Sequence, residues 1–93
     1  MASEGYHEEN LPPQTQDFHR AMRSLVEELE AVDAYQQRID ASPDAELRRV
    51  LGHNRDEEIE HACMLLEWLR RRVPKLDEEL RARLFQEGDI PKP

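Results

Sequence analysis

Residues 43–72 read PDAELRRVLGHNRDEEIEHACMLLEWLRRR, and their spacing decides the fold. Steps of four and three residues, which follow one face of a helix, connect Leu47, Leu51, Asn54, Glu58, His61, Leu65 and Trp68. This pattern predicts one helix from residue 43 to about residue 72, with Ser42 as its N-cap and Pro43 as its first residue. The seam is apolar at both ends and polar in its middle.

The polar middle of this seam places a carboxylate and an imidazole where apolar side chains are expected. Burying an ionised carboxylate without a partner is costly, so some compensating group should be present. Glu58 and His61 are three residues apart, and both side chains therefore leave the same helix face about one turn apart. A helix in a bundle uses this spacing to offer both groups to one metal ion.

A second heptad pattern predicts another helix, from about residue 15 to residue 41. Its seam comprises Phe18, Met22, Leu25, Leu29, Val32, Gln36 and Ile39. If the chain turns near Pro43, an antiparallel hairpin places Glu28 opposite Glu58, because each lies fifteen residues from that turn. At a rise of about 1.5 Å per residue, both lie about 22 Å from the turn. Glu28 is therefore a candidate third ligand. Alternatively, its side chain lies beside the seam and points into solvent.

These three residues amount to half of a known kind of metal centre. A di-iron site in a four-helix bundle takes a glutamate from each of two helices and a Glu-x-x-His pair from each of the other two. We therefore expect an all-α protein in which two copies of Glu28, Glu58 and His61 complete a site at a two-fold dimer interface. Such ligands suit iron or manganese, and also zinc.

Two other interpretations of the polar cluster stay open at this point. Buried polar groups also set register and oligomeric state in helical assemblies, so the chain is alternatively a non-catalytic oligomerisation module. A structural zinc dimer is the third interpretation. Redox activity discriminates among the three interpretations. Neither polar groups that set helix register nor a structural zinc site consumes oxygen.

The remaining segments predict a three-part organisation. Residues 1–14 show no periodicity and suggest a flexible arm, residues 15–88 form the helical hairpin with a short third helix, and residues 89–93 form a tail. The third helix is expected from residue 76 to about residue 86. Its stripe of Leu76, Leu80 and Leu84 is too short to be stable alone, so we expect it to dock on a neighbouring dimer.

Composition narrows the possible functions. The chain has 93 residues, enough for one domain, and a formal net charge of -8, which disfavours nucleic-acid binding. The longest apolar run, residues 62–66, is far shorter than the roughly 20 residues of a membrane-spanning helix. The single cysteine, Cys63, excludes an internal disulfide and fits a reducing cytoplasm. We expect Cys63 to be a small buried residue.

Three stretches resemble the encapsulated ferritins, the small ferritin-like cargo proteins of bacterial encapsulin nanocompartments. They are residues 26–33 followed by Tyr35, residues 53–62 and residues 66–71, and the likeness extends over about residues 15–88. The resemblance implies a two-helix hairpin with a short C-terminal helix. Two such chains would dimerise into a ferritin-like four-helix bundle with two iron ions per subunit pair, and the dimers would form a decameric ring.

The resemblance also assigns roles to residues. It implies that Glu28, Glu58 and His61 are the ferroxidase ligands and that Tyr35 lies beside them with a catalytic role. It places on Glu27 and Glu30 a site where metal enters, here called the uptake site, which would also accept calcium or zinc. On the residues alone, this pair is by default a pair of solvated acids. The family commonly has tryptophan just before the tyrosine, whereas this chain has Ala34.

The implied activity is oxidation of Fe(II) to Fe(III) with dioxygen, which supplies iron for storage inside an encapsulin shell in the bacterial cytoplasm. The implied partners are further copies of this chain and the shell protein, with neither nucleic acid nor membrane. Family members usually continue into a C-terminal targeting tail of small and apolar residues, which the sequence up to Pro93 does not show. Either that tail is missing here or targeting is done otherwise.

Overall fold

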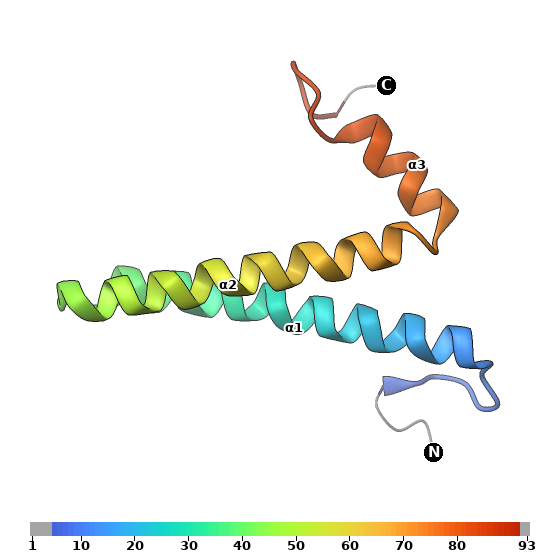
Figure 1. The fold of residues 1–93 in the computed structure, drawn as a ribbon, viewed down its shortest axis with the longest axis horizontal. Helices are drawn as coiled ribbons and strands as arrows, with labels where there is room; N and C mark the ends of the chain where they lie inside the picture. The colour runs from blue at the N-terminus through green and yellow to red at the C-terminus, as the bar shows by residue number, and fades with distance from the viewer. Residues whose placement is uncertain (1–4, 92–93) are drawn as a thin grey trace.

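The computed structural model describes residues 5–91 and shows an all-helical fold. Its elements are α1 (Pro13–Ala41), α2 (Ala45–Arg70) and α3 (Pro74–Arg83). Figure 1 shows α1 and α2 side by side as an antiparallel hairpin, from whose end α3 turns away. The predicted fold class, a hairpin followed by a short third helix, is confirmed. Residues 1–4 of the predicted arm and residues 92–93 of the predicted tail lie outside the described residues.

The turn between α1 and α2 differs from the predicted one. Ser42 ends α1, because its backbone N–H donates to the carbonyl oxygens of Arg38 and Ile39. The carboxylate of Asp44 accepts hydrogen bonds from the backbone N–H groups of Glu46, at 2.9 Å, and of Leu47, so Asp44 is the N-cap of α2. The prediction of Ser42 as cap and Pro43 as first helical residue is therefore wrong. An aspartate reaches the free N–H groups of a first turn as well as a serine does.

The hairpin buries little apolar surface. Its buried residues are Ala21, Ile39, Ala62 and Leu69, whose small or branched side chains let the two helices approach. Large seam residues stay exposed, including Leu29 at 55% and Leu47 at 45%. Cys63 is exposed as well, which corrects the expectation that it is buried. One chain therefore leaves a substantial part of its apolar seam uncovered.

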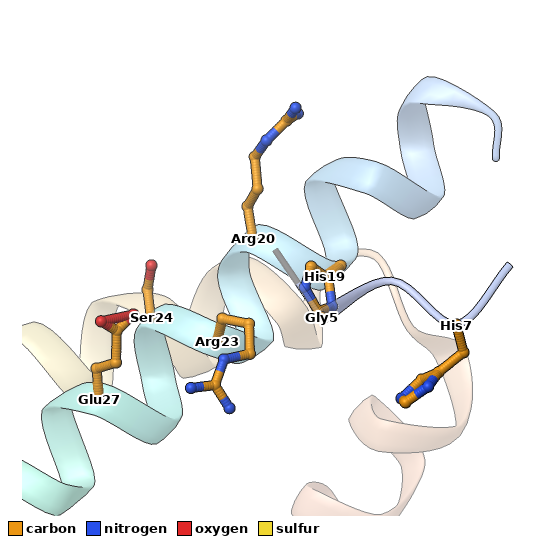
Figure 2. Close-up of a pocket in the computed structure, with 7 residues that line it drawn as sticks. All are labelled: Gly5, His7, His19, Arg20, Arg23, Ser24 and Glu27. Carbon is orange, nitrogen blue, oxygen red and sulfur yellow. The ribbon is translucent and has the colours of Figure 1, made fainter. Parts of the chain in front are cut away.

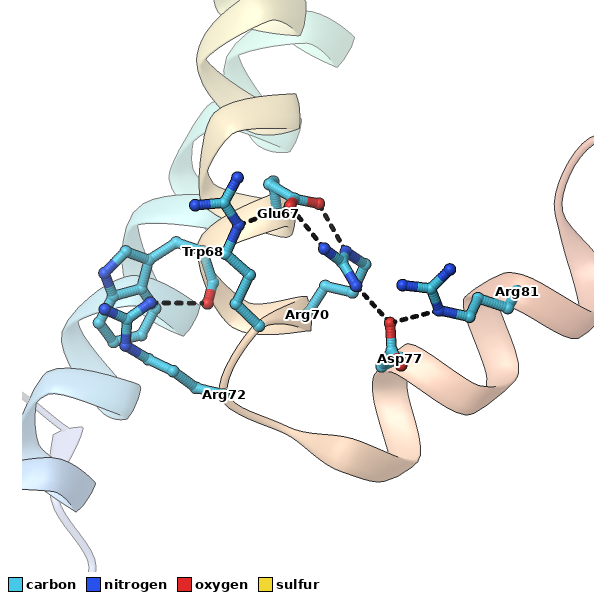
Figure 3. A network of polar contacts seen from close by, with 7 residues as sticks. Glu67, Trp68, Arg70, Arg72, Asp77 and Arg81 are labelled. Atoms are coloured by element: carbon cyan, nitrogen blue, oxygen red, sulfur yellow. Dashed lines mark hydrogen bonds and ion pairs between the residues drawn. The ribbon is translucent and has the colours of Figure 1, made fainter.

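An ionic network joins α2 to α3 (Figure 3). The guanidinium of Arg70 donates to both oxygens of Glu67 and to Asp77 at the start of α3, and Asp77 also accepts from Arg81 at 2.9 Å. Hydrogen bonds from Arg70 and Arg71 lower the pKa of Glu67 to about 2. Hydrogen bonds from Arg70 and Arg81 likewise lower the pKa of Asp77. These contacts orient α3 relative to the hairpin.

The bounds of the later helices also differ from those predicted. The structure ends α2 at Arg70 and runs α3 from Pro74 to Arg83, earlier at both ends than the predicted 76–86. Pro74 suits the first position of a helix because its missing N–H would have no partner there. After α3 the chain turns at residues 84–85, where Phe85 has a φ of 58°. None of the helices within residues 5–91 has an apolar stretch long enough to span a bilayer.

Candidate metal centre

Glu28, Glu58 and His61 come together midway along the hairpin. Glu28 lies on α1, and Glu58 and His61 leave one face of α2 a single turn apart. Each offers one ligand atom, and these atoms all lie within 4.8 Å of one another. Among residues 5–91 this is the one group of three or more histidine, cysteine or acidic side chains that converges in this way. The hairpin register worked out from the turn therefore places Glu28 across from the α2 pair.

The side chains of this cluster do not satisfy one another. His61 Nδ1 lies 3.6 Å from Glu28 Oε2 and 3.5 Å from Glu58 Oε2, both longer than the 2.7–3.2 Å typical of an N–H···O hydrogen bond. Glu28 Oε2 is buried and has no hydrogen-bond partner. A buried acceptor without a donor is unfavourable, and such groups call for an explanation. A cation bound between the three side chains would satisfy this oxygen.

The chemistry of the donor set fits a metal ion of the iron, manganese or zinc kind. Two carboxylates and an imidazole are oxygen and nitrogen ligands of intermediate hardness. The cluster is accessible, because the His61 side chain is 46% exposed while those of Glu28 and Glu58 are 24% and 25% exposed. One chain supplies three ligating groups, so the open side of the site is available for ligands from elsewhere.

The other residues expected at the site lie outside this cluster. Tyr35 follows Glu28 by about two turns of α1 and is half-buried, with the guanidinium of Arg38 over its ring at 5.4 Å. Glu27 and Glu30 are both exposed on α1, one turn apart. Within residues 5–91 no third ligating side chain joins these two carboxylates.

A second polar feature lies between α1 and the segment before it, and it was not predicted from the sequence. The segment before α1 folds back so that Tyr6 packs against the ring of His19, edge to face, with ring centres 4.7 Å apart. Between this segment and α1 lies an open hollow that His7, His19 and Arg23 help to line (Figure 2). His19 and Arg23 are four residues apart and share one face of α1, but no pattern in the sequence placed His7 beside them.

Comparisons with known proteins agree on one family. A family model described as EncFtn-like matches residues 4–87. An encapsulated ferritin-like protein of Rhodospirillum rubrum is 57% identical over 92 residues, covering 97% of this chain and 66% of that protein. This chain thus spans about two thirds of that relative's length. A ferritin-like protein of Thermotoga maritima is 53% identical over 87 residues, covering 91% of this chain and 76% of that one.

A solved structure agrees with these sequence matches. The crystal structure of a protein from Nitrosomonas europaea superposes with a TM-score of 0.91 at 54% sequence identity, covering 96% of this chain and 100% of that one. Sequence and fold thus match together over almost the whole chain, and the chain belongs to the EncFtn-like family.

Proposed function

We propose that this protein is a ferroxidase that oxidises Fe(II) with dioxygen at a di-iron centre shared between two chains. The observation that carries the proposal is the convergence of Glu28, Glu58 and His61, with a buried carboxylate oxygen of Glu28 that has no hydrogen-bond partner. Each chain offers one glutamate and one Glu-x-x-His pair. A second copy related by a two-fold axis supplies the same set, which completes the di-iron pattern of ferritin-like bundles.

The exposed apolar side chains beside the cluster support a shared site. Leu29 adjoins Glu28 and is 55% exposed, and Ile59 adjoins Glu58 and is 44% exposed. Packing a second hairpin against this face would remove both from water, which is favourable in proportion to the apolar area buried. The same packing would bring a second set of ligands to the cluster. The resulting unit would be a dimer with a four-helix core, and a ring of such dimers, a decamer, is the larger assembly proposed.

In this centre iron is the substrate. Each Fe(II) loses one electron, and dioxygen takes up two electrons and two protons to form hydrogen peroxide when one pair of ions reacts. The negative charge of the two carboxylates stabilises the more highly charged Fe(III) relative to Fe(II). Tyr35, two turns beyond Glu28, would shape the surroundings of the site. Glu27 and Glu30 would form the uptake site, where iron enters and calcium or zinc would compete.

We further propose that the oxidised iron is stored inside an encapsulin shell in the bacterial cytoplasm. The support is the family and the name of the Rhodospirillum rubrum relative, an encapsulated ferritin-like protein. On this proposal the shell protein is a partner of the chain, and the chain is its cargo.

The test is anaerobic loading of the purified protein with Fe(II), followed by oxygen addition, absorbance measurement and native mass spectrometry. We expect rapid formation of Fe(III), with one pair of irons per two chains. Mutation of a residue that only supports a metal ligand typically lowers metal affinity or activity about 10- to 100-fold. Glu58→Ala and His61→Ala remove a ligand itself, so each should slow oxidation by more than that.

Glu60→Ala is the matched control for this test, because Glu60 lies on α2 between Glu58 and His61 but is exposed and outside the cluster. It should oxidise iron at the wild-type rate. Wild-type rates in the Glu58 and His61 variants would reject the assigned site. Oxidation no faster than in buffer, in a well-formed oligomer of the wild type, would reject the ferroxidase and leave a zinc site or a register cluster.

A further inference from the structure

The second polar feature of the molecule is the hollow between the N-terminal segment and α1, here called the arm hollow. It has a volume of about 740 Å³ and lies along the outer side of α1, between His7 on the segment and Glu27 on the helix. Two imidazoles, two guanidinium-bearing side chains and the hydroxyl of Ser24 line it. Most of these groups are hydrogen-bond donors, although the whole chain carries a net charge of -8.

The positive charge of the arm hollow comes from Arg23. Arg20 is already paired, because its guanidinium donates to Asp17 at 2.9 Å. In Figure 2 the side chain of Arg20 leaves α1 on the opposite side from that of Arg23. Among the described residues Arg23 makes no ion pair and no hydrogen bond. Its five N–H donors are therefore free to bind a ligand.

A metal ion does not fit the arm hollow. His7, His19 and Glu27 do not converge as a ligand group, since the cluster around Glu28 is the one such group within residues 5–91. The charge of Arg23 would repel a cation as well. An oxyanion has the opposite preferences, because guanidinium and imidazole N–H groups and a serine hydroxyl all donate hydrogen bonds to its oxygens.

We propose that the arm hollow binds a small tetrahedral oxyanion such as inorganic phosphate. Arg23 supplies the charge-assisted hydrogen bonds, His7 supplies a further donor, and Glu27 at the edge opposes binding through its negative charge. This proposal does not depend on iron oxidation, although Glu27 is also assigned to the proposed uptake site.

The backbone of the N-terminal segment holds one wall of this site in place. Gly5 has a φ of 83°, and a Cβ there would lie 3.2 Å from Cε1 of His19. A side chain at position 5 would therefore strain the backbone and displace His19 or the segment. Gly5→Ala thus perturbs the hollow without changing any of its charges.

The experiment is isothermal titration of inorganic phosphate into the full chain, freed of metal by chelation, at constant ionic strength. We expect saturable binding in the wild type and a loss of affinity of about tenfold in Arg23→Gln, because a hydrogen-bonded charged partner is removed. The matched control is Arg49→Gln, since Arg49 is exposed on α2, away from the hollow. It makes the same change of charge and should bind like the wild type. Glu27→Gln should bind more tightly.

Several outcomes would overturn the proposal. Absence of saturable binding in the wild type would do so, as would equal weakening in Arg23→Gln and Arg49→Gln, which would indicate general charge screening. Circular dichroism and gel filtration establish that each variant keeps its helices and assembly. Gly5→Ala provides an independent check, because weaker binding with all charges retained supports the folded segment as part of the site. Unchanged binding in Gly5→Ala would count against that role.

Discussion

Replacing Glu28 by glutamine separates a metal site from a structural polar cluster. Glutamine has nearly the shape of glutamate but carries no charge and adds an N–H₂ donor. In the metal-free chain, Glu28 Oε2 is a buried acceptor without a partner, and two carboxylates share the cluster with a single imidazole. The native residue is therefore unfavourable without a cation, and Glu28→Gln should relieve that cost.

The magnitude follows from the burial of this carboxylate. An unsatisfied buried acceptor costs about 1–3 kcal/mol. Because the Glu28 side chain is still 24% exposed, we take the low end, about 1 kcal/mol, as the expected gain for Glu28→Gln. For a domain of this size that gain corresponds to a rise of about 4–8 °C in Tm. With metal the order should reverse, because a ligand at 100 times its Kd stabilises the wild type by about 2.7 kcal/mol.

The assay is urea unfolding followed by circular dichroism, at one fixed protein concentration because an oligomer's stability depends on it. Each protein is measured with a chelator and again with zinc, which binds such ligands without redox chemistry. Glu60→Gln is the control, since Glu60 is an exposed neighbour on α2 outside the cluster. Its stability should change by no more than about 0.5 kcal/mol under either condition.

A stability loss for Glu28→Gln in chelator would refute this reasoning. It would mean that the carboxylate makes a stabilising contact in the assembled protein, as a residue that sets helix register would. An equal response of wild type and variant to zinc would also refute it, because Glu28 would then not be a ligand.

Four further predictions concern the ionic network, the assembly and the third helix. Asp77→Asn removes the carboxylate that joins α3 to Arg70, so ¹⁵N relaxation should show faster motion of α3 amides; unchanged relaxation would show that the network does not hold α3. Because the folded pKa of Glu67 is about 2, below its ordinary value of 4.5, its ion pairs should stabilise the protein above pH 4.5, and this contribution should disappear as the pH falls from 4.5 toward 2. NMR titration of the Glu67 carboxylate checks that window, and a midpoint near 4.5 would contradict it. Leu29→Glu places a charge on the uncovered face of the hairpin and should shift the protein toward monomers in gel filtration, whereas a retained dimer would place the interface elsewhere. Deletion of the residues after Pro74 should leave dimers and abolish the larger ring, and a truncated chain that still forms the full assembly would reject α3 as the link between dimers.

Helical periodicity in the sequence was sufficient for the fold class and for the pairing of the helices. Heptad spacing on both sides of Pro43 predicted two long helices, and a turn there requires an antiparallel pair. The same count placed Glu28 opposite Glu58, because helical rise is nearly constant along a regular helix. Regular helical spacing also showed that the seam of α2 is interrupted by the polar residues Asn54, Glu58 and His61.

Local capping was less predictable. Both Ser42 and Asp44 are good N-cap residues. Which of them caps α2 depends on the end of α1, whose last carbonyl groups accept hydrogen bonds from the backbone N–H of Ser42. Cys63 looked buried because its neighbours in sequence are apolar, yet it lies on the exposed side of α2. α3 ends where Leu84 becomes extended and Phe85 takes a positive φ, and neither side chain signals such a break.

The sequence by itself therefore determined the two long helices, their antiparallel register and the Glu58 and His61 pair, and it made Glu28 a candidate third ligand. Only the tertiary structure decided that Glu28 turns inward with an oxygen that has no partner, because a residue beside a seam can point either way until the facing helix is in place. Only the tertiary structure also placed the aperiodic segment before α1 against His19 and Arg23. Sequence periodicity predicts regular helices, whereas the contacts of an irregular segment depend on the folded positions of the elements around it.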